Sequence, residues 1–448
     1  MSEPLRYVST RGGSAAVPLS EAIAAGLAPD GGLYVPTALP RLDPAAFDPH
    51  GTLATTAATL LAPFFAGDPL TAALPAICAE TFTFDTPLRA LAHDPSTLML
   101  ELFHGPTSAF KDVGARFLAA CLRRLPRRDA RALTILVATS GDTGAAVAAA
   151  FHRQPGVPAP DVPALDVRVV ILYPDGRVSP RQAHQLGCFG DNVHALRVAG
   201  RFDDCQRMVK AALGDAALQA ALPLSSANSI SLGRLLPQMS YHAHAALGWW
   251  HAHGTPLNVM VPTGNLGNAL ACLWAREIGL PIGQVQLSCN ANATLPDFFA
   301  GDDYRPREAV ATVANAMDVG APSNFERLRW TFPDDRALRA RLQAHSVDDA
   351  AIRHTITHHA AAHGEVFCPH TATAVHRLDQ LRAGGDASAW AVVATAHPAK
   401  FDSVVEPLLG HPLEVPAALA AMLARPAHAE PLAANDGALR DWLTRQLP

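Results

Sequence analysis

The chain has 448 residues, of which 49% are hydrophobic, 17% charged and 6% aromatic. This composition excludes an intrinsically disordered protein, and no apolar run approaches the roughly 18 residues that a membrane span requires. Lys and Arg number 35 against 40 Asp and Glu, a formal net charge of −5 without any basic block, so binding to nucleic acid or to an anionic membrane is not expected.

The N-terminus and the cysteines predict a cytoplasmic protein. Residues 1–4 show no basic stretch followed by an apolar one, so no secretory signal is evident. The seven cysteines are spaced singly, without a Cys-x-x-Cys pair. An odd number of isolated cysteines is typical of reduced thiols rather than of a disulfide framework.

The predicted elements begin with turns and short helices over residues 1–95, where Asp30-Gly31-Gly32 predicts a tight turn. From residue 97 onwards, short β-rich runs alternate with helical runs. The predicted strands are 97–103, 133–138, 167–173, 193–198, 257–261, 285–289 and 391–396. The predicted helices are 111–124, 145–152, one that starts near Ser179, 202–213 and 269–278. This alternation predicts an α/β fold with parallel sheets, whose ligands bind where strands end and helices begin.

Changes in the pattern of residues near residue 96 and over residues 213–223 indicate domain boundaries. We therefore predict an N-terminal segment (1–95), a smaller α/β domain (96–215) and a larger α/β domain (216–448). The segment 301–349 is rich in Asp and Arg, and we expect it to be an exposed excursion from the fold. No internal repeat is visible.

Lysine is scarce in this sequence. Only Lys111, Lys210 and Lys400 occur among the 35 basic residues. The abundance of Ala and Arg is typical of a GC-rich genome, and a surface lysine can persist by chance. However, arginine cannot form a Schiff base, whereas lysine can. The remaining lysines are therefore candidates for chemistry that requires an amine.

Lys111 lies in Glu101-Leu-Phe-His-Gly-Pro-Thr-Ser-Ala-Phe-Lys-Asp112, which joins a β-rich run to a helix. A lysine at the start of a helix is disfavoured as a cation by the helix dipole, which helps to lower its pKa. An amine with a lowered pKa is a better nucleophile towards an aldehyde. The alternative is a solvated Lys111 that pairs with Asp112.

The loop Ala138-Thr-Ser-Gly-Asp-Thr-Gly144 also joins a strand to a helix, and it offers hydroxyls, a carboxylate and N–H groups to a small polar ligand. Its last three residues, Asp-Thr-Gly, match the tripeptide of the aspartic proteases. That chemistry needs two carboxylates that share a proton, and no second Asp-Thr-Gly is present. Capping of the following helix by Asp142 or Thr143 is the structural alternative.

The loop Pro262-Thr-Gly-Asn-Leu-Gly-Asn268 follows a strand and opens a helix. Its two glycines allow close approach of a ligand, and N–H groups at a helix N-terminus favour an anion such as phosphate. It is neither Gly-x-Gly-x-x-Gly nor followed by Gly-Lys-Ser/Thr, so dinucleotide and P-loop sites are not indicated. A glycine-rich turn that binds nothing stays an alternative.

Histidines cluster late in the chain, at His354, His358, His359, His363, His370 and His376. His359 and His363 have the i, i+4 spacing of a helical zinc pair. The residue after His359 is Ala360, so the His-Glu-x-x-His motif is absent. Because no third ligand is evident, we expect solvated helix histidines and no metal site.

Together these motifs resemble the threonine synthases, a pyridoxal-phosphate-dependent family of the tryptophan synthase β (fold type II) class. The segment Phe103-His-Gly-Pro-Thr-Ser-Ala-Phe-Lys-Asp112 is similar to the family's cofactor-lysine motif and is the most specific piece. The other similar segments follow in the family's order at 7–11, 26–36, 139–144, 227–230, 263–268, 369–372 and 395–400. An ordered set over most of the chain is far more specific than any single motif.

The resemblance implies fold type II, with two parallel-sheet domains and an N-terminal family segment, and pyridoxal 5′-phosphate as the cofactor. Lys111 would bind the cofactor as a Schiff base, and Thr395 would offer its hydroxyl to the pyridine nitrogen. The glycine loop would surround the phosphate, and residues 140–143 would lie by the phenolic oxygen and the substrate carboxylate. The implied cofactor-binding residues are Lys111, Asp142, Gly264, Asn265, Leu266, Gly267, Asn268 and Thr395.

The implied reaction converts O-phospho-L-homoserine and water into L-threonine and phosphate, with Lys111 as the acid and base for the proton shifts. Arg234, Lys400 and Ser179 are candidates for the substrate phosphate, because a dianion needs cationic or hydroxyl partners. The residues that we expect to contact the substrate are Thr107, Ser140, Gly141, Thr143, Ser179, Arg234 and Lys400.

The sequence departs from the family pattern in four places, none of which removes a group that the chemistry requires. Asp142 stands where many fold-type-II relatives have Asn, Leu266 replaces Phe, Cys368 replaces Asp and Ser231 replaces Asn. Two alternatives stay open. One is a phospho-lyase that releases 2-oxobutyrate, ammonia and phosphate. The other is an inactive relative that binds a ligand or a partner, against which the presence of Lys111 speaks. The sequence is compatible with a monomer or a homodimer.

Overall fold

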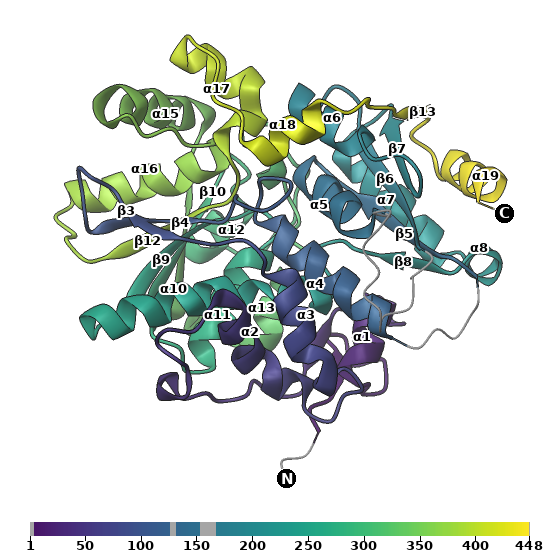
Figure 1. Ribbon diagram of the computed structural model, residues 1–448, viewed down its shortest axis with the longest axis horizontal. Coiled ribbons are helices and arrows are strands. Elements are labelled where there is room, and N and C mark those ends of the chain that lie inside the picture. Colours follow the sequence, from purple (N-terminus) through teal and green to yellow (C-terminus); the bar gives the residue numbers. More distant parts are fainter. Residues whose placement is uncertain (1–3, 126–130, 153–166, 448) are drawn as a thin grey trace.

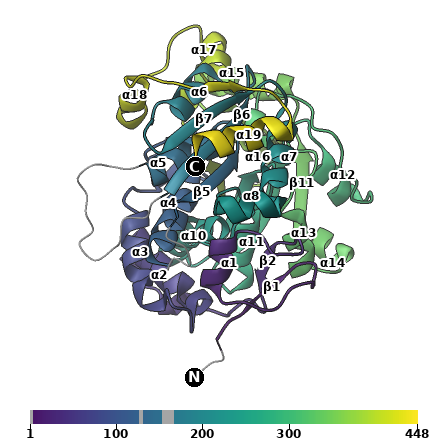
Figure 2. The same ribbon diagram turned by 90° about the vertical axis from the view of Figure 1, so that its right-hand side faces the viewer.

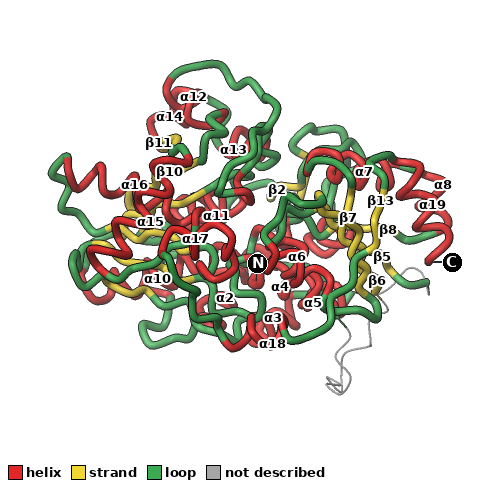
Figure 3. The backbone as a smooth tube through the Cα atoms, turned by 90° about the horizontal axis from the view of Figure 1, so that it is seen from above, coloured by secondary structure: helices red, strands yellow, loops and turns green. Residues whose placement is uncertain are grey.

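The computed structural model describes residues 4–125, 131–152 and 167–447. Two α/β units lie side by side, each built on a sheet of mainly parallel strands (Figure 1). Seen from above, the strands form two separate groups with helices between and around them (Figure 3). This arrangement confirms the predicted α/β class. Within these residues, no helix is long and apolar enough to cross a membrane.

The larger sheet has six strands in the order β11-β10-β9-β12-β4-β3, and only the β3–β4 pair is antiparallel. Its strands are β3 (Leu88–Ala90), β4 (Thr97–Glu101), β9 (Leu257–Pro262), β10 (Ile282–Cys289), β11 (Leu342–Ser346) and β12 (Trp390–Ala394). Every residue of β12 is buried, as expected for a parallel sheet that is covered by helices on both faces.

The smaller sheet has five parallel strands in the order β13-β7-β6-β5-β8. Its strands are β5 (Leu133–Ala138), β6 (Val167–Pro174), β7 (Val193–Val198), β8 (Leu224–Ser226) and β13 (Glu430–Leu432). Alternate residues pack on opposite faces because successive side chains of a strand point in opposite directions. Ile135 and Val137 thus belong to the main core, whereas Leu136 and Ala138 belong to a second cluster beneath the C-terminal helix.

Helices cover both sheets. Those that follow the N-terminal segment are α4 (Lys111–Arg124), α5 (Asp142–Phe151), α6 (Pro180–Gly187), α7 (Phe202–Gly214), α8 (Ala216–Ala221), α9 (Leu232–Leu235), α10 (Gln238–His253), α11 (Gly267–Glu277), α12 (Thr294–Ala300), α13 (Phe325–Thr331), α14 (Asp335–Arg341), α15 (Asp349–His363), α16 (Pro369–Ala383), α17 (Asp402–Leu409), α18 (Ala417–Leu423) and α19 (Asp436–Gln446), with single turns η4 (Asn315–Met317) and η5 (Pro398–Phe401). On the larger sheet, α10 and α11 lie on one face, and α15 and α16 form the layer on the other.

The N-terminal segment packs against both units, at the bottom of the molecule in Figure 2. It comprises β1 (Tyr7–Ser9), α1 (Leu19–Ala25), β2 (Tyr34–Pro36), η1 (Pro44–Ala46), α2 (Leu53–Leu61), η2 (Ala62–Phe65), η3 (Thr71–Ala73) and α3 (Leu74–Thr81). Helix α2 packs on α10 of the larger unit, and α3 packs on α4 of the smaller one. The predicted turn at Gly31 is present, with φ of 76° and an N–H bond from Gly32 to the Asp30 carboxylate.

The predicted domain boundaries are wrong at three strands. Strand β4 falls in the predicted smaller domain (96–215) but lies in the larger sheet, between β12 and β3. Strands β8 and β13 fall in the predicted larger domain (216–448) but pair with β5 and β7 in the smaller sheet. Parallel strands pair through crossover connections, so a boundary read from local composition does not reveal which sheet a strand joins.

The prediction that residues 301–349 form an exposed excursion holds for residues 301–312, which are mostly exposed and contain no helix or strand, but it is wrong for residues 313–349. This stretch contains α13 and α14, and β11 extends the larger sheet in parallel with β10. Arg327 is fully buried, and its guanidinium donates to the carbonyl oxygens of Tyr34 and Ile230 at 2.9 and 2.6 Å. A charged residue is tolerated in the interior when its donors are satisfied in this way. A high content of charged residues therefore does not show that a segment is exposed.

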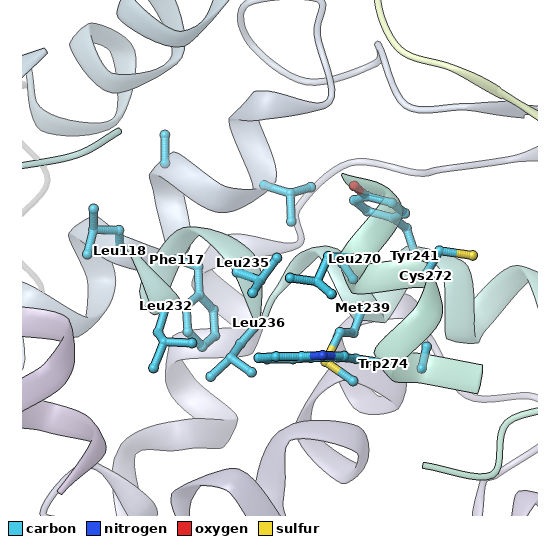
Figure 4. Packing of buried hydrophobic residues seen from close by; sticks show 14 of the residues in the cluster. Phe117, Leu118, Leu232, Leu235, Leu236, Met239, Tyr241, Leu270, Cys272 and Trp274 are labelled. Atoms are coloured by element: carbon cyan, nitrogen blue, oxygen red, sulfur yellow. The ribbon is translucent and has the colours of Figure 1, made fainter. Parts of the chain in front are cut away.

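The main core joins the elements that carry the functional loops. Phe117 of α4, Leu235 of α9, Met239 of α10 and Trp274 of α11 pack together (Figure 4). The four helices are therefore fixed relative to one another by apolar contacts that exclude water. The residues that begin α4 and α11, and the short helix α9, face the same region as a result. All seven cysteines are buried and unpaired.

Candidate active site

A cavity of about 770 Å³ lies where loops after strands of both sheets meet. Its wall includes Ala138 at the end of β5, Pro262 at the end of β9, and Thr395 directly after β12. Carboxyl ends of parallel strands are the usual ligand sites of such sheets. The predicted site residues in the wall are Lys111, Ser140, Asp142, Thr143, Arg234, Gly264, Asn265, Leu266, Gly267, Asn268 and Thr395.

Lys111 is held at the crossover between the two units. Strand β4 belongs to the larger sheet, whereas α4, which begins at Lys111, packs on α5 of the smaller unit. The Phe110 N–H donates to the Thr395 carbonyl at 2.9 Å, which ties the lysine to the loop after β12. Burial lowers the pKa of Lys111 to about 8, opposed by Asp142 and reinforced by Arg234 and Lys400. About a tenth of the amine is then neutral at pH 7.

The loop that precedes α11 has the shape of an anion cradle. A Cβ atom at Gly264 would lie 2.8 Å from the Cα of Met317, so only glycine fits there. Leu266 adopts a left-handed conformation with φ of 62°, which turns the chain into the helix. The Asn265 side chain fixes the loop, because it donates to Ser229 Oγ at 2.6 Å and accepts the Ser323 N–H at 2.5 Å. The first N–H groups of α11 have no intrahelical partner and can receive a phosphate.

Two buried donors in the cavity wall have no partner. The Oδ1 atom of Asn268 accepts from His242 Nε2 at 2.7 Å and from Tyr241 at 3.0 Å, while its Nδ2 atom is unbonded. His370 Nε2 accepts the Ala316 N–H at 3.0 Å, so the neutral ring carries its proton on Nδ1, which is also unbonded. Burial lowers the pKa of His370 to about 4. Unpaired buried donors are costly, so this wall fits a ligand rich in acceptor oxygens.

Asp142 is the anion of the site. Its Oδ1 atom lies 2.8 Å from Lys400 Nζ and accepts from Gln182 Nε2 at 2.9 Å. Burial alone would raise the pKa of Asp142, but Lys400 and Lys111 outweigh burial and hold the pKa well below its usual range. The carboxylate is therefore ionised, and its charge attracts the ammonium groups of Lys400 and Lys111.

Four predicted substrate residues do not belong to the cavity wall: Thr107, Gly141, Ser179 and Lys400. Lys400 Nζ donates to the Thr107 carbonyl at 2.6 Å. The Ser179 hydroxyl donates to the Lys400 carbonyl at 2.6 Å and caps α6 by accepting the Gln182 N–H at 3.1 Å. Lys400, Thr107 and Ser179 are thus linked, in part through main-chain carbonyls, in one buried network behind Asp142. Their contact with the substrate stays a prediction.

Some wall residues were missed from the sequence. Lys210, exposed on α7, lies in the wall, as do Arg11 and Glu326, whose side chains form an ion pair at 3.1 Å. Over the described ranges, Lys210 has no ion-pair partner. The scarcity of lysine applied equally to Lys210, but no motif surrounds it. His370 was visible within Pro369-His-Thr-Ala372, although its role as a donor depends on the backbone of η4.

Comparison with known proteins gives a consistent result. Residues 80–399 match the family described as pyridoxal-phosphate dependent enzyme, residues 6–82 match the threonine synthase N terminus, and residues 371–442 match the threonine synthase C-terminal family. A threonine synthase of Serratia marcescens is 38% identical over 430 residues, which cover 95% of this chain and 96% of that protein.

Solved structures agree with the sequence comparison. The crystal structure of Escherichia coli threonine synthase superimposes with a TM-score of 0.87 at 34% identity, covering 98% of this chain and all of the other. The pyridoxal-phosphate-bound threonine synthase of Brucella melitensis gives a TM-score of 0.86 at 32% identity, with 99% of each chain covered.

The pKa of Lys111 predicts a pH profile for its reaction with an aldehyde. Because only the neutral amine is nucleophilic, the rate at which the apoprotein forms a borohydride-reducible adduct with pyridoxal phosphate should rise about tenfold per pH unit up to about pH 8 and then level off. Peptide mass spectrometry after reduction locates the adduct, and Lys111→Ala is the control without it. A rate that still rises tenfold per unit near about pH 10 would contradict the lowered pKa.

The buried pair of Asp142 and Lys400 predicts a stability effect. Lys400→Met leaves a buried carboxylate without its nearest cation, and this should lower the free energy of unfolding by about 3–5 kcal/mol. The double variant Lys400→Met/Asp142→Leu should recover part of that loss, because the carboxylate is no longer stranded and Lys111, which loses the compensating charge of Asp142, can become neutral. Urea denaturation followed by circular dichroism measures both. Lys210→Met is the matched control on the exposed lysine, with a change within about 0.5 kcal/mol. Equal losses in the single and double variants would refute the pairing.

Proposed function

Because the chain belongs to the threonine synthase family of pyridoxal-phosphate-dependent enzymes, we propose that it converts O-phospho-L-homoserine and water into L-threonine and phosphate. The family resemblance and the cofactor class drawn from the sequence motifs are confirmed. One observation in this structure supports the activity most directly. A half-buried lysine with a lowered pKa lies in the same cavity as a glycine-rich anion cradle.

The wall residues fit pyridoxal phosphate. The loop from Gly264 to Asn268 would hold its phosphate, since the loop excludes a side chain at Gly264 and opens a helix. Lys111 would bind its aldehyde carbon, and the Thr395 hydroxyl would meet its ring nitrogen. The unbonded Nδ2 of Asn268 and Nδ1 of His370 are donors available to its oxygens. When bound, this cofactor supplies an electron sink for carbanion character at Cα and then Cβ of an amino acid.

Lys111 moves the protons. With its amine free, the Nζ atom of Lys111 would accept a proton from a substrate carbon and later return it. A pKa of about 8 suits this task, because near neutral pH the protonated and the neutral amine are both populated, with about a tenth neutral at pH 7, and Lys111 can act in both directions. The charge of Asp142 opposes the effect of burial on the pKa of Lys111, so a protonated fraction of Lys111 persists in the site.

The positive groups of the wall bind the anionic ends of the substrate. Arg234 is buried, and although burial lowers its pKa to about 10, it stays charged at neutral pH. Lys210 is exposed at the wall and, among the described residues, is not neutralised by a carboxylate. We assign the substrate phosphate to Lys210 and Arg234 together. Of the three predicted candidates, Arg234 is thus kept, whereas the polar atoms of Lys400 and Ser179 serve the network of Asp142 and α6.

The N-terminal segment helps to shield the reaction from water. Arg11, Ala28, Gly31 and Leu33 contribute to the wall although they lie far from the cofactor motifs in the sequence. The Arg11 and Glu326 ion pair joins this segment to α13 of the larger unit. Water must reach only one substrate carbon, so a closed wall here favours addition over side reactions.

The net charge and the cysteines indicate the partners and the location of the enzyme. We propose that it acts on a small molecule without a nucleic-acid partner, in keeping with the net charge of −5. Seven buried, unpaired cysteines support a cytoplasmic location. We expect a monomer or a homodimer, which sedimentation would distinguish.

A phospho-lyase that releases 2-oxobutyrate and ammonia is the competing activity.

Product stoichiometry tests the activity. Purified holoenzyme with O-phospho-L-homoserine should release phosphate and threonine in equal amounts, measured together with 2-oxobutyrate. Lys111→Ala should lower turnover by at least about a thousandfold, because both the covalent anchor and the proton acceptor are removed. Phosphate with 2-oxobutyrate and without threonine would establish the phospho-lyase instead. Threonine formation at the full rate by Lys111→Ala would refute the assignment of Lys111.

The role of Lys210 can be tested separately. Lys210→Ala should raise the KM for O-phospho-L-homoserine about tenfold with kcat changed by less than about twofold, because a charge-assisted contact to a non-reacting phosphate oxygen contributes to binding. Lys210→Arg, which keeps the charge, is the matched control and should stay near the wild-type KM. Steady-state kinetics at low and high salt provide the measurement. An unchanged KM in Lys210→Ala would remove Lys210 from the substrate site.

A further inference from the structure

A histidine cluster lies apart from the catalytic cavity, on the side of the molecule that carries β3 and α15, at the left of Figure 1. His93 comes from the connection between β3 and β4, and His359 and His363 come from α15. One ligand nitrogen from each of the three rings lies within 4.8 Å of the others. We propose that His93, His359 and His363 form a binding site for a divalent transition-metal ion, with Zn²⁺ as the best-fitting ion.

The fold supplies the third ligand that the sequence did not show. His359 and His363 are one helical turn apart and so share a face of α15. His93 is remote in sequence, but its ring stacks on that of His363 with centroids 3.6 Å apart, and lies 5.8 Å from the ring of His359. The absence of a third ligand was the reason for expecting no metal site, and the position of His93 removes that reason.

His359 has the hydrogen bonding of a metal ligand. It is 3% exposed, and its Nε2 atom lies 3.0 Å from Oδ2 of Asp379. A carboxylate only accepts hydrogen bonds, so Nε2 carries a proton, and in the neutral ring Nδ1 then presents a lone pair. This Nδ1 atom is buried and has no partner. A histidine that donates one N–H to a carboxylate and leaves its other nitrogen free is the arrangement found in metal sites.

The ligand set selects the kind of ion. Three imidazole nitrogens without a carboxylate or thiolate ligand favour Zn²⁺ and its neighbours over Mg²⁺ or Ca²⁺. A tetrahedral ion would take water as its fourth ligand. Bond lengths of about 2.0–2.1 Å require the nitrogens to approach to about 3.4 Å. His93 and His363 are exposed and can turn to close this distance, while His359 is fixed by Asp379.

The surroundings leave room for an ion to enter. A second cavity of about 870 Å³ is lined by the three histidines together with Asp379, and it shares no wall residue with the catalytic cavity among the described parts of the chain. Bound metal would tie the β3–β4 connection to α15. An ion that binds only the folded state stabilises that state, so occupancy should raise the melting temperature.

Zinc binding by the holoenzyme tests the proposal. The protein is freed of metal with a chelator and then dialysed against graded ZnCl₂, and zinc per chain is measured by elemental analysis. We expect one tight site per chain. His93→Ala should weaken binding by about a hundredfold or more, and Asp379→Asn by about tenfold to a hundredfold, because Asp379 orients a ligand without touching the ion. His358→Ala, which alters the exposed neighbour of His359, is the matched control and should bind as the wild type does.

Melting temperature gives the second readout. Zinc should raise the Tm of the wild type and of His358→Ala, and leave that of His93→Ala unchanged. His93 is exposed, so this variant should fold, and its Tm without zinc verifies this. The absence of stoichiometric zinc in the wild type would overturn the proposal. So would wild-type affinity in His93→Ala, or a loss of zinc in His358→Ala that matches the loss in His93→Ala.

Discussion

The charge balance around Asp142 is the interaction on which the active site depends. Lys400 is fully buried and Lys111 is half-buried in the cavity wall, and an uncompensated ammonium group is expensive in such surroundings. Asp142 compensates both, by direct contact with Lys400 and through its field at Lys111. The outcome differs for the two lysines. Lys400 uses its donors on Asp142 and the Thr107 carbonyl, whereas Lys111 remains available at the cavity wall with a lowered pKa.

The two-sheet architecture brings these groups together. Lys111 follows β4 of the larger sheet, Asp142 follows β5 of the smaller sheet, and Lys400 follows β12 of the larger sheet. Each lies just beyond the carboxyl end of its strand, where loop backbone and helix N-termini are free to bind ligands. The buried salt bridge therefore joins the two units behind the cavity wall.

The sequence predicted the loops of the site because their local patterns carry the chemistry. A strand, a glycine-rich turn and a helix are adjacent along the chain, so Gly264 to Asn268 and residues 139–144 could be recognised without tertiary information. What the sequence did not predict depends on contacts between distant segments. The place of β4 in the larger sheet, the capping role of Ser179 and the burial of Arg327 are each decided by partners elsewhere in the chain.

The histidines show why residue type alone does not decide function. In His370, a backbone N–H occupies Nε2, so the proton lies on Nδ1 and the free nitrogen is a donor suited to an oxygen-rich ligand. In His359, a carboxylate occupies Nε2, so the proton lies there and the free nitrogen is a lone pair suited to a metal ion. Both rings are buried and both leave Nδ1 unbonded. The partner at the opposite nitrogen thus determines which ligand each ring can accept, and that partner is a property of the fold.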